Sequence, residues 1–166
     1  AYVIPDEDMD IFKRVYCEKV FKNSEQEFLT EAQLPTAGPI LIDLDFRYDV
    51  NIEERQHTAD HVMDTVELYL EQLRKIVNIT DETFPVFVLE KPNVNTLDDV
   101  TKDGIHIVMG IHLRHEAQMA LRELMLGEID NVLSELPLQN DYDSVIDRGI
   151  VTGKTNWQLY GSRKPG

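Results

Sequence analysis

The stretch Pro39-Ile-Leu-Ile-Asp-Leu-Asp45 decides the fold, because it has the pattern of a buried strand that carries two carboxylates. Side chains alternate between the two faces of a strand. Asp43 and Asp45 therefore share one face with Leu41, and the remaining apolar residues form the opposite face. Two adjacent carboxylates repel each other, so a cation that neutralises them favours keeping both. Hard divalent ions with oxygen ligands are the natural candidates.

The composition is that of a globular chain. With 166 residues, of which 42% are apolar, it is long enough for one domain or two small lobes sharing a core. The single Cys17 excludes a disulfide framework and an all-cysteine zinc site, which fits a reducing, intracellular setting. No apolar run approaches the roughly 20 residues of a membrane-spanning helix. The chain begins without Met and stops soon after a patterned strand, so we expect a domain taken from a longer protein.

The charge is distributed unevenly. A net charge of −15 would ordinarily argue against binding to nucleic acid. Residues 148–166, however, contain four basic side chains and no acidic one, so all 31 acidic residues lie in 1–147. An acidic body with a basic end suits a protein that holds cations at one place and phosphates at another. Charge alone also allows a plain acidic surface with a chance basic cluster.

Apolar periodicity predicts alternating helices and strands. Helical spacing covers residues 6–21, 53–77 and 115–136. Extended patterns cover residues 40–46, 84–90, 104–113, 145–151 and 156–160, with polar loops at 91–103 and 137–144. This order predicts an α/β (α+β) fold in which helices pack on a mainly antiparallel sheet.

Two further residues on these strands have side chains suited to chemistry. Gly104 and His106 face the same way, so the histidine has open space beside it for a phosphate or a nucleotide. The alternative is a hydrogen-bonded histidine at a sheet edge. Asp147 lies among short apolar residues on an extended segment and is either a third metal ligand or a turn or cap residue. His57 and His61 have zinc-binding spacing, but no third ligand is evident.

The end of the chain has the character of a phosphate site. Ser162, Arg163 and Lys164 place a hydroxyl and two cations after the glycine turn at Gly161. Backbone N–H groups and the lysine would be the donors to a phosphate. The alternative is a solvated hairpin end.

The order of these motifs resembles the archaeo-eukaryotic primase (AEP) superfamily. An apolar strand ending in Asp-x-Asp is followed by small-x-His, an apolar-Asp segment and Tyr-Gly-Ser-x-Lys, over about residues 39–166. The chain is most similar to primase domains of large DNA viruses, where such a domain leads a longer chain that also carries a superfamily 3 helicase. The resemblance implies an RRM-like primase core and a single primase catalytic domain over 1–166.

The resemblance also implies roles for the carboxylates. Asp43 and Asp45 match the first motif and Asp147 matches the third, so these three would bind two Mg²⁺ or Mn²⁺ ions. Gly104 and His106 match the second motif, in which the histidine contacts the phosphates of the incoming nucleotide.

Further phosphate contacts follow from the same resemblance. Lys102 stands where relatives often place one, and Ser162 with Lys164 matches the motif that grips the triphosphate, with Arg163 adding charge. Relatives often have arginine where this chain has Gln158, which puts one phosphate or template contact in doubt.

The activity implied is metal-dependent nucleotidyl transfer, which makes primers on single-stranded DNA from nucleoside triphosphates during viral DNA replication inside the host cell. Two alternatives stay open: a metal-dependent nuclease or phosphohydrolase, and a non-catalytic module that binds nucleic acid or docks a helicase. The lack of a membrane-length apolar run predicts no membrane partner.

Overall fold

The computed structural model describes residues 2–80 and 83–164, and the chain divides into two compact units. The first unit joins Ala1–Ala32 to Asn156–Gly166, and the second is Gln33–Thr155. The predicted catalytic domain over 1–166 comprises both units. In the described ranges, no helix combines the length and the apolar character needed to cross a membrane.

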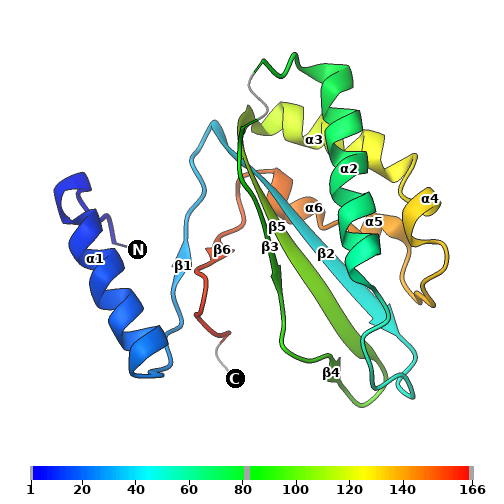
Figure 1. The fold of residues 1–166 in the computed structure, drawn as a ribbon, viewed down its shortest axis with the longest axis horizontal. Helices are drawn as coiled ribbons and strands as arrows, with labels where there is room; N and C mark the ends of the chain where they lie inside the picture. Colours follow the sequence, from blue (N-terminus) through cyan, green and yellow to red (C-terminus); the bar gives the residue numbers. More distant parts are fainter. Residues whose placement is uncertain (1, 81–82, 165–166) are drawn as a thin grey trace. The chain divides into compact units, whose positions relative to one another are not determined.

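The second unit is built on a sheet of two long strands and two short ones (Figure 1). Strand β2 (Ala37–Tyr48) pairs with β5 (Thr101–Arg114), and β5 pairs on its other side with β3 (Val86–Glu90). The short β4 (Asn95–Thr96) pairs with the beginning of β5. All of these pairings are antiparallel, which confirms the predicted sheet.

One face of this sheet forms the hydrophobic core. Helices α2 (Ala59–Ile76) and α3 (His115–Leu126) bury apolar side chains in the same cluster as the strands. The fully buried strand residues of this face are Ile40, Ile42, Leu44, Phe46, Tyr48, Ile105, Ile107 and Met109. Burying one such large apolar side chain contributes roughly 1.5–3 kcal/mol. The predicted division of β2 into a core face and a carboxylate face is therefore confirmed.

Helix α2 begins six residues later than predicted, at Ala59. The Thr58 side chain accepts a hydrogen bond from the His61 N–H, and the His61 Nδ1 atom accepts one from the Thr58 N–H. This reciprocal cap stabilises the helix start at that point. His61 is thus a capping residue, and residues 53–58 lie outside the helix.

Two other predicted elements are wrong in detail. The helix predicted over 115–136 ends at Leu126, and the short α4 (Asp130–Leu133) follows Gly127, a poor helix former. The extended segment predicted over 145–151 is largely helical, with α5 (Tyr142–Val145) and α6 (Arg148–Val151). Only Ile146 pairs there, in a single antiparallel bridge to Leu44.

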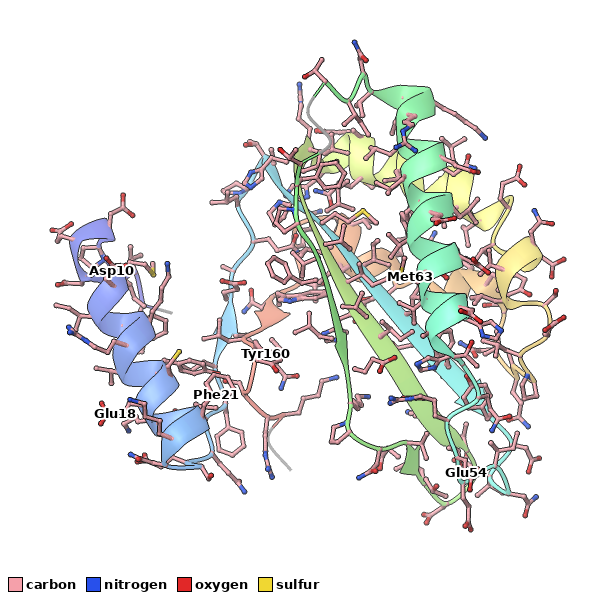
Figure 2. The ribbon with its side chains drawn as sticks, viewed as in Figure 1. Asp10, Glu18, Phe21, Glu54, Met63 and Tyr160 are labelled. Carbon is pink, nitrogen blue, oxygen red and sulfur yellow. The ribbon has the colours of Figure 1, made fainter. Side chains whose placement is uncertain are left out.

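The first unit contains one helical run and a small sheet. The 3₁₀ turn η1 (Asp6–Asp8), α1 (Met9–Cys17) and the π-helical η2 (Glu18–Lys22) follow one another, which confirms the predicted helix. Strand β1 (Thr30–Glu31) pairs with β6 (Trp157–Gln158), so the last strand is shorter than predicted. Figure 2 shows Phe21 beside Tyr160, whose rings stack with centroids 5.5 Å apart.

Candidate functional site

The register of β2 and β5 brings the first two motifs together. Asp43 lies opposite His106, and Asp45 lies opposite Gly104, on the face of the sheet that points away from the core. The Oδ1 atom of Asp43 is 3.3 Å from Nε2 of His106. Their side chains are 21% and 34% exposed, so both remain open to a ligand. A carboxylate pair and a histidine therefore share one patch, as the sequence predicts.

Position 104 requires a glycine, because the neighbouring strand leaves no room for a side chain. A Cβ atom at this position would lie 2.7 Å from the Leu44 carbonyl oxygen, closer than real Cβ contacts allow. It would also stand 3.6 Å from Oδ1 of Asp45. A side chain here would have to move the backbone of β2, because a carbonyl oxygen cannot rotate out of the way. The small residue of the small-x-His motif thus keeps the strands in close register beside Asp45.

Asp147 reaches this patch from a different element. Ile146 bridges to Leu44, and the N–H of Asp147 donates to the Asp43 carbonyl oxygen at 2.9 Å. Directly opposed residues of antiparallel chains share a face. This register places Asp147 next to Asp43, on the side of the sheet away from the core. The backbone of Asp147 therefore lies beside that of Asp43, and the grouping of the three carboxylates stays a prediction.

The donor atoms of the three aspartates suit a hard divalent ion, but the described structure does not group the three carboxylates around one point. Carboxylate oxygens are the ligands that Mg²⁺ and Mn²⁺ prefer. The Asp147 Oδ1 atom accepts the N–H of Gly149 at 2.9 Å and so caps α6. In the ranges that the structure describes, no three His, Cys, Asp or Glu side chains are grouped closely enough to hold a metal.

Arg47 is a residue of this face that the sequence analysis did not single out. It lies opposite Lys102, two register positions further along the strands from Asp45 and Gly104. Like charges directly opposite each other destabilise a sheet. An anion bound between the two cations would offset that repulsion. The signal was available, because Arg47 follows Asp45 at the strand period of two.

An apolar pair continues the same face in the other direction. Leu89 of β3 lies opposite His106, and Phe87 lies opposite Val108. Phe87 is 58% exposed, which is unusual for a phenylalanine on a strand that borders a core. The face therefore changes from cationic to acidic to apolar along the strands.

A buried ionic cluster supports Gly104 from the core side. Asp103 has a fully buried side chain, and Arg55 donates to its two oxygens at 2.9 and 3.1 Å. The Oδ1 atom of Asp103 also accepts the Gly104 N–H at 2.9 Å. This hydrogen-bonded carboxylate raises the pKa of Arg55 above its ordinary value. His57 joins the cluster through Glu90, at 2.9 Å. Sequence reasoning missed it, because it assigned residues 53–58 to a helix.

The predicted tail residues belong to the first unit. The Ser162 hydroxyl lies 2.9 Å from the Tyr16 hydroxyl and accepts the Leu29 N–H at 3.1 Å. The prediction that Ser162 contacts phosphate therefore concerns a hydroxyl that already has two partners. Arg163 and Lys164 are exposed. Gly161 has a φ of +87°, as a glycine turn requires.

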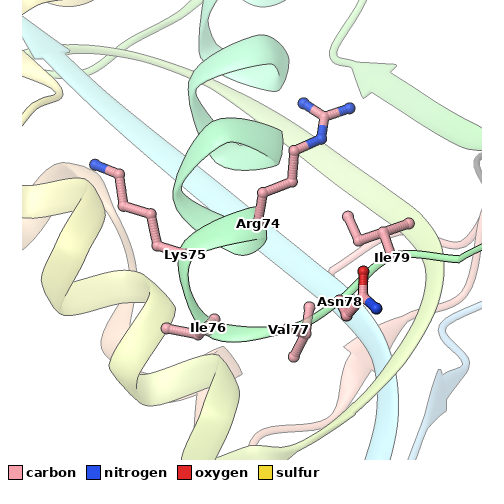
Figure 3. Close-up of a pocket in the computed structure, with 6 residues that line it drawn as sticks. All are labelled: Arg74, Lys75, Ile76, Val77, Asn78 and Ile79. Carbon is pink, nitrogen blue, oxygen red and sulfur yellow. The ribbon is translucent and has the colours of Figure 1, made fainter.

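One hollow in the described residues has none of the residues of this patch in its lining. It measures about 540 Å³ and lies at the end of α2, with no predicted site residue in its lining (Figure 3). Its walls are formed by Arg74, Lys75, Ile76, Val77, Asn78 and Ile79.

Two comparisons with known proteins bear on these residues. The sequence model of a family described as "C962R protein N-terminal AEP domain" matches residues 1–166. A protein of Acanthamoeba polyphaga mimivirus, named "Putative helicase L207/L206", is 32% identical to this chain over 166 residues. That similarity covers 98% of the chain but 17% of the mimivirus protein. The matched region includes every site residue described above.

Proposed function

Because the chain belongs to the family of C962R protein N-terminal AEP domains, we propose that it is the catalytic domain of a DNA primase. The observation that supports this most strongly is the β2–β5 register, which opposes Asp43 to His106 and Asp45 to Gly104. Asp147 adds a third carboxylate through its backbone bond to Asp43. The proposed reaction joins nucleoside triphosphates on a single-stranded DNA template.

The three aspartates would hold two Mg²⁺ or Mn²⁺ ions. Such ions activate the attacking 3′-hydroxyl and stabilise the leaving pyrophosphate. The chain itself supplies the negative charge that retains them, and the strands fix two of the three carboxylates in advance. Gly104 lets the two strands approach closely beside Asp45.

Phosphate binding falls to the cations of the same face. His106 stands beside Asp43, so its ring is oriented before a triphosphate arrives. Lys102 and Arg47 form a cationic pair two register positions beyond Asp45 and Gly104, on the same face. We assign the triphosphate to these side chains of the second unit. The phosphate contacts expected of Ser162, Arg163 and Lys164 stay a prediction.

The partners follow from the same assignment. The mimivirus relative is named a helicase and is several times longer than this chain. We propose that this domain works at the front of a longer primase-helicase, with a superfamily 3 helicase behind it. Its site of action would be viral DNA replication in the host cell.

The decisive experiment offers the protein an unprimed single-stranded DNA circle, nucleoside triphosphates and Mn²⁺ or Mg²⁺. We expect labelled primers from the wild type and none from Asp45→Asn. Asp64→Asn is the matched control, because Asp64 is an exposed carboxylate on α2. Primer synthesis by Asp45→Asn at the wild-type rate would refute the assignment, and shortened template strands would indicate a nuclease.

One observation favours a second candidate, a non-catalytic module that binds nucleic acid. The Asp147 carboxylate is occupied as the cap of α6. A module of this kind would bind single-stranded DNA equally well with and without Mn²⁺. The primase assignment instead requires that Mn²⁺ and a triphosphate bind together.

A further inference from the structure

Arg122 of α3 is a buried charge next to the segment that carries Asp147. It is 1% exposed, and its Nε atom donates to the Ile146 carbonyl oxygen at 2.9 Å. Its Nη2 atom donates to the Asp143 carbonyl oxygen at 2.7 Å. A buried guanidinium is costly unless its N–H groups are bonded. Here they are bonded to the backbone of the chain that leads into the site.

The ion pairs of Arg122 are the weaker part of its surroundings. Asp143 and Glu123 approach it at 2.9 and 3.4 Å, but their side chains are 73% and 68% exposed. Exposed carboxylates contribute little to an ion pair, because water screens them. The carbonyl oxygens of Ile146 and Asp143 are therefore the main partners of the buried Arg122.

The peptide group between Ile146 and Asp147 is held from both sides. Its C=O accepts from Arg122, and its N–H donates to the Asp43 carbonyl oxygen at 2.9 Å. A peptide group is planar, with C=O and N–H pointing in opposite directions. This single rigid group thus links α3 to β2, and the Asp147 side chain extends from its end.

We propose that Arg122 is a positioning residue for the metal-binding carboxylate at Asp147, a role that rests on the proposed function. It sets the plane of the 146–147 peptide and so keeps the backbone of Asp147 beside Asp43, from where the side chain can reach the metal site. An arginine is required because its fork reaches two carbonyl groups at once. A lysine at this position has the same charge but cannot reproduce that geometry.

The test compares Arg122→Lys with Gln118→Met. Gln118 lies one turn earlier on α3, is also buried, and also donates to backbone carbonyl groups, those of Gly38, Pro39 and Leu113. Gln118→Met should disturb the packing of α3 about as much as Arg122→Lys does, but it removes no hydrogen bond to the 146–147 peptide. The first readout is hydrogen exchange of the Asp147 amide. We expect it to exchange about tenfold faster or more in Arg122→Lys and unchanged in Gln118→Met.

The second readout is Mn²⁺ affinity, which is measured from the magnetic resonance signal of the free Mn²⁺. Loss of a group that orients a metal ligand typically weakens binding by about 10–100-fold. We expect this weakening in Arg122→Lys. In an Asp147→Asn background, Arg122→Lys should cause no further loss, because the ligand it positions is already gone.

The outcomes separate this role from the primase assignment. Unchanged Asp147 exchange in Arg122→Lys, or equal effects in Gln118→Met, would overturn the positioning role whatever the activity. Additive losses of Mn²⁺ affinity in the double variant would also overturn it. A wild type that binds Mn²⁺ but makes no primers would refute the primase assignment and leave the positioning role standing. A wild type that binds no Mn²⁺ would overturn both.

Discussion

The β2–β5 pair and the 141–151 segment deliver parts of the same site by different means. The strands place Asp43, Asp45 and His106 through a continuous register, in which each residue is fixed by its neighbours. Asp147 instead depends on one bridge, one backbone bond to Asp43 and the buried Arg122. A register spreads its stability over many bonds, whereas the segment relies on a few. We therefore expect the segment to be the part of the site that adjusts when a metal binds.

The largest expected effect lies at the buried end of the strand pair. Asp103→Ala removes the partner of Arg55 and the acceptor of the Gly104 N–H. Arg55 keeps Glu90 and the Lys91 carbonyl oxygen, so the cost comes from the lost hydrogen bonds and from the Gly104 N–H that is left without its acceptor. We expect a loss of about 3 kcal/mol in urea unfolding. Asp103→Asn keeps one acceptor oxygen and should lose less. Equal stability of the Ala variant and wild type would show that the strands do not need this cluster.

A pair of glycine variants tests whether close strand contact at the site is required. Gly104→Ala forces a Cβ atom against the Leu44 carbonyl oxygen, and such overpacking costs about 1–3 kcal/mol. Gly38→Ala is the matched control on the same strand pair, since its Cβ atom would meet nothing within 4 Å. We expect Gly38→Ala to be neutral or to stabilise the protein by up to about 1 kcal/mol. Thermal melts that shift equally in both variants would contradict this account of Gly104.

The segment is tested by two changes at Asp147. Asn caps a helix about as well as Asp, so Asp147→Asn should keep wild-type stability, while Asp147→Ala should lose roughly 1 kcal/mol. Both should abolish primer synthesis, because both remove the charge. Full activity in Asp147→Asn with a stability loss in Asp147→Ala would make this residue a cap alone. Thermal melts and the primer assay are run on the same preparations.

The smallest expected effect is a pH dependence at the start of the segment. Hydrogen bonds from the Ser144 side chain and from its N–H, the latter at 2.8 Å, lower the pKa of Asp141. A carboxylate with a lowered pKa in the folded state stabilises the protein at any pH above its ordinary pKa. That stability is lost as the pH falls through the folded-state pKa. Asp141→Asn should therefore show a slightly shallower decline in urea midpoint between neutral and acidic pH. An identical decline would remove Asp141 as a contributor.

The sequence was sufficient for the strand half because the information there is local. Alternation over 39–45 and 104–108 assigns each side chain to a face, and the observed burial agrees. The motif order identified the family that the comparison also found. The register between the strands is not local, so the opposition of Asp43 and His106 was only an expectation until the structure placed them.

The structure of residues 141–151 was predicted poorly, because it depends on caps and on contacts with distant residues. Residues 145–151 form a short stretch in which apolar residues flank Asp147 and Arg148, a pattern typical of a strand. Two caps nevertheless turn most of this stretch and the residues before it into single helical turns. The capping oxygens of Asp141 and Asp147 are visible in the sequence only as acids. Arg122 lies on a helical pattern in which a charged residue normally faces water, and its burial depends on carbonyl groups more than 20 residues away. Contacts of this kind have no periodic signal.

The central claim is that the strand carboxylates and Asp147 together hold the ions of a nucleotidyl transferase. The most direct measurement is the number of Mn²⁺ ions bound per protein in the presence of a non-hydrolysable nucleoside triphosphate. The account predicts about two ions for the wild type and fewer for Asp147→Asn, at unchanged thermal stability. Equal numbers bound by the two proteins, or no stoichiometric Mn²⁺ in the wild type, would contradict it.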